Sequence, residues 1–273
     1  MSMKICTTSL AGRLALVCSA LCLSAGGLLA ENAPNPDRLL QEMSSKLAAA
    51  RTLRVVAERE IDPALAEHSK AATKSRITIV AQRPNMLVAE SAARGDTRHV
   101  YADGRHLTFY DPEKKFYATV PFSGSIDALV DELHHVYGFT PPVAEFVRTD
   151  VRGDIRQKTQ HVSYLGRARY PSGFLGLNGV ECHRLLLAGR GADAELWIGD
   201  GDLLPHRLIA TLKAHPNRPQ MKVDFRDWKL GAKVQHEEFA FVPPKGAMRI
   251  PVKTTAQMTP VTPTGHAKKV QKS

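Results

Sequence analysis

The sequence predicts a single α+β domain built on a curved antiparallel sheet, with one helix at its start and a helical insert in its middle. Three observations predict this fold. Apolar residues recur at helical spacing just after residue 36, then alternate with period two in short runs, and a second helical stretch interrupts those runs halfway. A sheet of about ten or eleven strands tends to coil on itself, and the helices can then plug its concave face.

The composition excludes several classes of protein. The chain has 273 residues, of which 43% are hydrophobic, and this is enough to bury a core. The formal charge is +10, but residues 1–30 and 252–273 carry six of the basic residues and no acid, so the body has a net charge of only +4. With 6% aromatic residues as well, neither a basic footprint nor a stacking surface indicates a nucleic-acid partner.

Residues 1–30 read as a secretory signal peptide. Lys4 and Arg13 precede an apolar run over 14–23, and small residues follow as far as Ala30, after which we expect cleavage, with Gly26-Gly27 as the second choice. The apolar run of about ten residues is well short of the roughly 20 that span a bilayer. We therefore expect export to the periplasm and no transmembrane span after cleavage, with an uncleaved anchor as the alternative.

The positions of the cysteines are consistent with export through a cleaved signal peptide. Cys6, Cys18 and Cys22 lie in the segment to be removed, which leaves Cys182 without an intramolecular disulfide partner. A lipidated Cys18 or Cys22 is disfavoured because bulky residues stand where lipoprotein processing needs small ones.

The domain itself is expected over residues 31–251. Leu39, Leu40, Met43 and Leu47 form one apolar stripe of a first helix that begins near Asp37. Period-two runs then predict an antiparallel meander, with strands around 53–58, 76–79 and 86–90 and later over 160–164, 180–187, 195–198, 207–212 and 220–230.

The clearest hairpin joins 107–110 to 116–120, and we expect Leu107 and Phe109 to share a face with Phe116, Ala118 and Val120. Asp111-Pro112 opens its turn, because proline fixes the backbone dihedral that a turn needs. Residues 125–133 then predict a helix with Ser125 as its cap, and 143–147 predict a second short helix. Threonine–proline pairs and lysines over 252–273 predict a disordered basic tail.

Two stretches resemble a known family. The first is Tyr-Ala-Asp-Gly-Arg-His-Leu-Thr-Phe-Tyr-Asp-Pro at 101–112 with Lys-Phe-Tyr-Ala at 115–118; the second runs from Gly-Val-Glu-Cys-His at 179–183 through Glu-Leu-Trp-Ile at 195–198 and Leu-Pro-His-Arg at 204–207 to Phe-Arg-Asp-Trp at 225–228. Over residues 37–250 or so, they resemble the predicted periplasmic proteins of bacterial domain-of-unknown-function family 2092. That family brings no catalytic residue and no activity with it.

A more remote resemblance is to the LolA/LolB lipoprotein-carrier superfamily, through the Trp-Ile strand followed by a turn and Leu-Pro-x-Arg. This resemblance implies an unclosed β-barrel whose concave side is covered by helices. Better-known relatives bind acyl chains in that cavity, although a shared fold does not by itself transfer function.

The sequence indicates no catalytic residue, metal ligand or cofactor site. The Gly-x-Ser-x-Gly elbow of serine hydrolases and the His-Glu-x-x-His pattern of zinc enzymes are absent. His134 and His135 are neighbours on a helix, where one buried edge and one solvated ring are expected, and Cys182 and His183 point to opposite faces of a strand. Gly199-Asp200-Gly201-Asp202 lacks the ligand spacing of a calcium loop.

The remaining informative set is a group of apolar side chains expected to face inward. They would line a ligand cavity under a lid formed by the insert at 125–137, or simply pack as core: Phe109, Phe116, Leu129, Leu133, Trp197 and Phe225. We therefore expect a non-enzymatic binding protein for a lipid, acyl chain or lipoprotein segment. The alternative is an envelope protein-interaction or stress-sensor module with the same fold and no small ligand, whose basic tail touches anionic lipid or cell-wall polymer.

Overall fold

The computed structural model describes residues 33–65, 73–138, 143–172 and 178–258. The expected signal peptide, three of the four cysteines and residues 259–273 of the expected tail lie outside these ranges. The chain divides into two units, Met1–Pro34 and Asn35–Ser273, and the second contains all the helices and strands described here.

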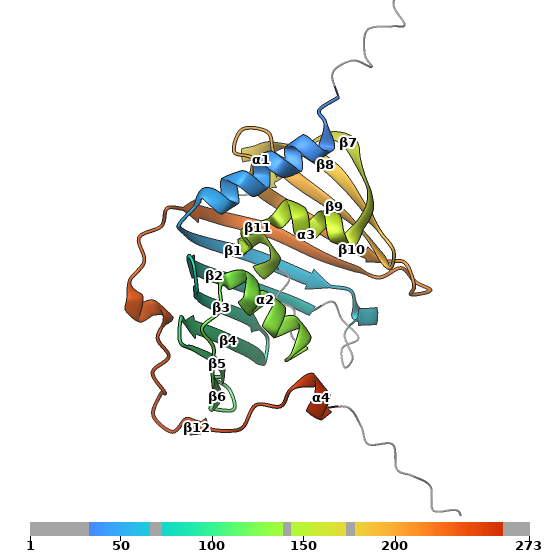
Figure 1. The fold of residues 1–273 in the computed structure, drawn as a ribbon. Helices are drawn as coiled ribbons and strands as arrows, with labels where there is room; N and C mark the ends of the chain where they lie inside the picture. The colour runs from blue at the N-terminus through green and yellow to red at the C-terminus, as the bar shows by residue number, and fades with distance from the viewer. Residues whose placement is uncertain (1–32, 66–72, 139–142, 173–177, 259–273) are drawn as a thin grey trace, which may run out of the picture. The chain divides into compact units, whose positions relative to one another are not determined.

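One twelve-stranded sheet forms the second unit (Figure 1). Its strands are β1 (Thr52–Ile61), β2 (Thr73–Gln82), β3 (Met86–Ala93), β4 (Asp96–Asp103), β5 (His106–Asp111), β6 (Phe116–Pro121), β7 (Thr159–Ser172), β8 (Asn178–Gly189), β9 (Ala192–Gly199), β10 (Pro205–Leu212), β11 (Gln220–Leu230) and β12 (Met248–Arg249). The spatial order is β12-β6-β5-β4-β3-β2-β1-β11-β10-β9-β8-β7. Two antiparallel meanders thus meet where β1 pairs with β11, and the end strands β12 and β7 do not pair with each other.

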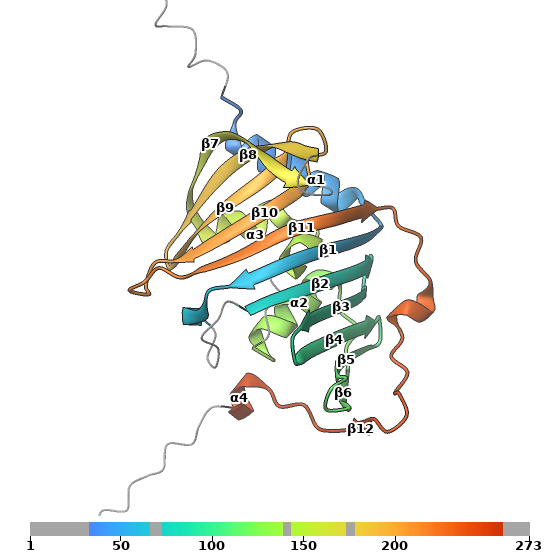
Figure 2. The same cartoon turned by 180° about the vertical axis from the view of Figure 1, so that it is seen from behind.

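The prediction of an open, curved sheet with helices is confirmed, with one strand more than the ten or eleven expected. The helices are α1 (Pro36–Ala49), η1 (Pro63–Leu65), α2 (Ile126–His135), η2 (Ala144–Val147), α3 (Val151–Lys158), η4 (His236–Phe239) and α4 (Thr255–Met258). Helices α1, α2 and α3 lie on one face of the sheet, which we call the inner face (Figures 1 and 2). The short helix η4 lies against the opposite, outer face.

Helix α1 forms where its apolar stripe predicts it. Its N-cap is Asn35, whose side chain accepts from the backbone N–H of Asp37 at 2.9 Å, and Asp37 itself lies in the first turn. Pro36 suits the first helical position, where no donor is needed. Helix α2 has its predicted cap, since Ser125 Oγ accepts from the backbone N–H of Ala128 at 3.2 Å.

The core lies between the helices and the inner face. In β1, Leu53, Val55 and Ala57 alternate with more exposed residues and are fully buried. Phe146 of η2 meets Phe225 of β11 edge-on, with 5.0 Å between the ring centroids. The helices therefore fill much of the inner face with side chains.

Helix α3 was not predicted, because its sequence has a glycine in its middle and no apolar stripe. Polar contacts replace that stripe. Asp150 accepts from the backbone N–H of Gly153 at 2.8 Å, and Arg152 donates to Asp37 of α1 at 3.3 Å from its Nε. Only Val151 of this helix is buried, so the helix is held by caps and ion pairs more than by packing.

The segment after β11, residues 231–258, forms what we call the C-terminal strap. Figure 1 shows it, orange to red, running from the end of β11 past the edge strand β6 to α4. Phe239 is fully buried against Val80 and Met86 on the outer face. Because β12 and α4 lie in this strap, the structured part of the chain continues beyond residue 251, where the sequence places the start of the tail.

Candidate functional site

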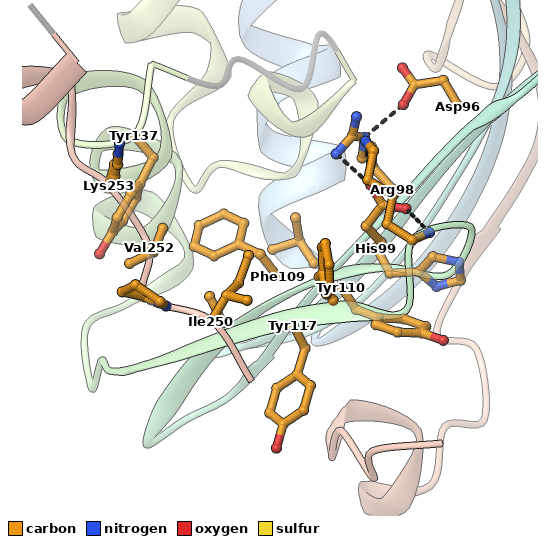
Figure 3. A pocket seen from close by; sticks show the side chains of 16 residues that line it. Asp96, Arg98, His99, Phe109, Tyr110, Tyr117, Tyr137, Ile250, Val252 and Lys253 are labelled. Carbon is orange, nitrogen blue, oxygen red and sulfur yellow. Dashed lines mark hydrogen bonds and ion pairs between the residues drawn. The ribbon is translucent and has the colours of Figure 1, made fainter. Parts of the chain in front are cut away.

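An apolar cavity of about 580 Å³ lies at the β6 edge of the sheet, on the side of α2 (Figure 3). Its walls come from three separate parts of the chain. Strands β4, β5 and β6 supply one wall, the residues just after α2 supply a second, and the strap supplies the third. The volume falls within the range of roughly 300–1,000 Å³ that is usual for small-molecule sites.

The lining is mostly aromatic and aliphatic. Strand pairing places Phe109 opposite Ala118, and Asp111 opposite Phe116, so Phe109, Ala118 and Phe116 share one face as the hairpin predicted. The other aromatic and aliphatic lining residues are Val100, Tyr110, Tyr117, Tyr137, Ile250, Pro251 and Val252. An acyl chain would meet little polar surface inside.

Charged side chains stand at one rim of this cavity. Arg98 Nε lies 2.7 Å from Asp96 and its Nη1 lies 3.0 Å from Asp111, while the ammonium group of Lys114 is also 3.0 Å from Asp111. Although partial burial opposes it, the hydrogen bonds from Lys114 and the charge of Arg98 lower the pKa of Asp111. This rim can pair with a polar head group while the apolar wall holds a hydrocarbon chain.

The strap covers the mouth of the cavity and is tied down on both sides of it. On one side the backbone N–H of Met248 donates to Lys115 O and that of Ile250 donates to Tyr117 O, both at 2.8 Å. On the other side the N–H of Thr255 donates to Val136 O at 2.7 Å. Residues 250–253 bridge these two attachments and form one wall of the site, which stays partly open to solvent.

A second attachment lies on the outer face. The ring of Phe241 packs among Tyr101, Tyr110 and Tyr117, with centroid separations of 5.3, 5.2 and 5.2 Å. The strap therefore passes around the exposed edge of β6 from the outer face to the inner one. This cover also shields part of an edge strand that could otherwise pair with another chain.

The six residues expected to line a cavity are divided by the structure. Phe109 and Phe116 line the edge cavity. Leu129, Leu133 and Phe225 are about 1% exposed and belong to the main core, so the structure does not place them on the cavity wall.

Trp197 lies on the outer face, and the expectation that it faces inward was wrong. Its neighbours Leu196 and Ile198 are the ones in the core. Trp197 instead lies beneath the guanidinium of Arg207, 5.2 Å from its ring centroid. The Arg207 guanidinium also lies 5.0 Å from the ring centroid of Tyr170, near the end of β7. The end of β7 therefore lies over the outer face, and side chains on both faces of β9 are at least partly buried.

The other sites weighed in the sequence are structural where they are described. His183 Nδ1 is 3.1 Å from the hydroxyl of Tyr164, and its Nε2 is 2.7 Å from Asp200, a chain of contacts that joins β7, β8 and the turn after β9. Cys182 is fully buried, and burial raises the pKa of its thiol to about 12. The His134 and His135 rings meet edge-on, and both residues are exposed, against the expectation of one buried ring. Within the described ranges, no group of three His, Cys, Asp or Glu side chains could hold a metal ion.

Sequence reasoning missed the part of the site that the strap contributes. Tyr137 was included only as the end of the lid, and Ile250 and Val252 were placed at or beyond the end of the domain. A signal was present, because Met248, Ile250 and Val252 alternate with Arg249, Pro251 and Lys253. That period-two pattern indicates an extended segment with one apolar side.

These features define a class: an open antiparallel sheet whose inner face is covered by helices, with an apolar cavity at one edge. The chain belongs to the DUF2092 family, described as a predicted periplasmic protein, whose family model matches residues 36–253. No curated protein matches the chain. No helix among the described residues has the length and apolar character needed to cross a membrane.

Several solved structures are similar at low sequence identity. An uncharacterized conserved protein from Thermus thermophilus is 12% identical over 77% of this chain and 98% of that one, with a TM-score of 0.45. MucB in its complex with MucA from Pseudomonas aeruginosa is 12% identical over 77% and 62%, with a TM-score of 0.41. A LolA superfamily protein from Nitrosomonas europaea is 11% identical over 77% and 99%, with a TM-score of 0.34.

Proposed function

We propose that this protein binds the hydrocarbon chain of a small amphiphile, such as an acyl chain of a lipid or lipoprotein, in the edge cavity. The observation that carries the proposal is the cavity itself: about 580 Å³, lined mainly by apolar side chains, with a segment of the same chain as one wall. Its size fits one chain better than the several chains of a larger lipid. The role is one of binding and not of catalysis.

Burial of hydrocarbon supplies the driving force. Each methylene group removed from water contributes about 0.8 kcal/mol, so about eight of them contribute roughly 6 kcal/mol. That is enough to offset a substantial part of the cost of association. The rim formed by Arg98, Asp111 and Lys114 then holds the polar end of the ligand near water.

The ligand contacts we propose are Phe109 and Phe116, together with the strap residues Ile250 and Val252. Leu129 and Leu133 support this wall from the core, and Tyr137 extends the same helical segment to the cavity. The lid is thus formed by the strap and the end of the insert together.

The compartment we propose is the periplasm, reached through a signal peptide that is removed after Ala30. The charged start, the short apolar run and the small residues of 1–30 support it. N-terminal sequencing of the protein recovered from its envelope tests this, and a first residue at Met1 would contradict it.

A titration with a fluorescent fatty acid tests the binding function, and two tryptophan variants make it specific. Val252→Trp places a large ring in the cavity wall, whereas Val242→Trp makes the same change on the strap at a position outside the cavity that is 79% exposed. We expect displaceable binding by the wild type and by Val242→Trp, and at least about tenfold weaker binding by Val252→Trp. Equal binding by both variants, or none by the delipidated wild type, would contradict the proposal.

A second candidate is recognition of an envelope protein at the edge of β6. Phe116 and Tyr117 of this strand pair with β12, and the Arg249 side chain donates to Thr119 O at 3.1 Å, so a partner strand would replace the strap at this edge. Crosslinking in the native envelope distinguishes the two functions. Under this alternative, Val252→Trp keeps its crosslinked partner although its cavity is filled.

A further inference from the structure

Exposed apolar side chains gather on the strap. Among the described residues, four large hydrophobic side chains are exposed, and three of them, Val242, Met248 and Ile250, lie within nine positions of the strap. Val242 is 79% exposed and Met248 is 58% exposed. Single exposed hydrophobic side chains are common on protein surfaces, but several of them close together beside a cavity indicate an interaction surface.

Beyond Glu238, the charged side chains of the strap are all basic. Lys245, Arg249 and Lys253 alternate with the apolar residues and are exposed. No aspartate or glutamate follows Glu238 in the rest of the sequence, whereas the body of the chain carries nearly equal numbers of both signs. The side chains of this segment are therefore suited to a surface that is both negative and partly apolar.

The backbone fixes this arrangement. The N–H of Ala247 donates to Pro244 O at 2.9 Å, and Gly246 has a φ of +82°, which glycine adopts without strain in a tight turn. Lys245 stands at the tip of that turn. The hydrogen bond from Met248 N–H to Lys115 O then places another lysine of the β5–β6 turn next to the strap.

We infer that this basic strap patch, comprising Val242, Lys245, Met248, Arg249 and Lys253, docks the protein onto the surface of an anionic phospholipid bilayer. Apolar side chains enter the interfacial region, and the cations beside them pair with the lipid phosphates. An acidic protein partner would match the charge, but it would not explain why apolar side chains are interleaved with the cations at high exposure.

Docking in this way would bring the bilayer next to the cavity mouth, because Ile250, Val252 and Lys253 border both the patch and the cavity. Figure 3 shows Val252 and Lys253 on the strap segment that passes over the site. The inference does not require the cavity to bind a ligand, so the two proposals can fail separately.

Sedimentation with lipid vesicles tests the inference. The full mature chain is mixed with vesicles of phosphatidylcholine alone, or with about 30% phosphatidylglycerol. We expect binding only to the anionic vesicles, weakening as salt is added. No binding to anionic vesicles at low salt, or equal binding to both kinds, would overturn the inference.

Matched variants locate the surface. Lys245→Gln with Arg249→Gln removes two charges from the patch, and Lys74→Gln with Lys229→Gln removes two exposed charges elsewhere. We expect the first pair to weaken vesicle binding at least about tenfold and the second less than about twofold. An equal effect of both pairs would overturn the inference, because only the net charge would then matter.

The apolar contribution has its own control. Met248→Ser and Leu165→Ser each remove a large exposed side chain, and Leu165, on β7, is 40% exposed. We expect only Met248→Ser to weaken vesicle binding. Val252→Trp, which fills the cavity, should still bind vesicles, so that loss of the ligand and loss of the membrane surface are told apart.

Discussion

The ring of Tyr137, just beyond helix α2, meets the ring of Phe109 on β5 edge-on, with 5.0 Å between their centroids (Figure 3). Both rings line the cavity, and Phe109 also packs against the main core. This pair therefore separates the open space at the sheet edge from the filled interior. It also sets how far a hydrocarbon chain can reach.

Shortening the Phe109 side chain should change the preferred ligand length. Phe109→Leu adds volume where the cavity meets the core, so we expect the best-binding straight-chain fatty acid to become longer. Competition against a fluorescent probe with a series of chain lengths measures this. Phe122→Leu is the control, because Phe122 packs against the same core without lining the cavity. An unchanged preference in Phe109→Leu would contradict the assigned role.

The strap should act as a lid that must open before a ligand enters. The hydrogen bond from Thr255 N–H to Val136 O marks where it meets α2. A disulfide between Val136→Cys and Thr255→Cys should slow probe uptake at least about tenfold, as expected for a gating segment, and reduction should restore the rate. The buried Cys182 should not interfere. Uptake at the same rate in both redox states would show that ligands enter by another route.

Arg148 should be the most costly arginine to remove from the helical layer. Only 11% of its side chain is exposed, and it lies 2.7 Å from both Asp131 and Glu145. Burial opposes its charge, but these hydrogen bonds raise the pKa of Arg148. Its loss removes the ion pair with half-buried Glu145, which keeps only Lys158 at 3.4 Å, and a hydrogen bond to Asp127 O, so we expect Arg148→Ala to lower the free energy of unfolding by about 2–3 kcal/mol.

Urea unfolding measures this loss of unfolding free energy, and an exposed ion pair serves as the comparison. Arg38 makes an ion pair with Glu42 on α1 and is 79% exposed. Arg38→Ala should therefore cost less than about 1 kcal/mol. Similar losses in the two variants would show that the ion pairs of Arg148 add nothing beyond those at the surface.

Cys182 should make folding sensitive to alkaline pH. Burial raises the pKa of its thiol from 9.0 to about 12 in the folded protein. The unfolded chain therefore loses this proton first, and stability falls as pH rises from about 9 toward 12, by at most about 1.4 kcal/mol per pH unit. Below pH 9 the thiol is neutral in both states, so its contribution is constant there.

The variant Cys182→Ala isolates this effect. The difference in unfolding free energy between the wild type and the variant should be constant up to about pH 9 and should then move in favour of the variant. A thiol reagent should also label Cys182 only after unfolding. A difference that does not change with pH would show that the thiol titrates alike in both states.

Much of the fold was predictable because local patterns decide it. The stripe of Leu39, Leu40, Met43 and Leu47 required a helix, and the alternation in β1 required a strand with one buried face. The hairpin of β5 and β6 formed with the expected shared face, since turn chemistry fixes its register. Helix α3 escaped prediction because it has no apolar stripe and its ion pair with Asp37 of α1 is set by tertiary structure.

The site was less predictable for a physical reason. Over the whole of β9, Ala194, Leu196 and Ile198 alternate with Asp193, Glu195 and Trp197, so the pattern places Trp197 on the charged face. The expectation used only the four residues 195–198, where this alternation does not show. The cavity also depends on a parallel pairing of only two residues between β12 and β6, across 132 positions from Phe116 to Met248. Local sequence patterns do not predict a pairing of this kind, although the alternation over 248–253 indicated an extended segment.

Native mass spectrometry of the protein purified from its own envelope without detergent tests the central claim most directly. We predict a fraction of molecules carrying one bound single-chain lipid, identified after extraction, and no such mass on Val252→Trp. Protein that is recovered without a lipid and gains none when incubated with fatty acids would contradict the account.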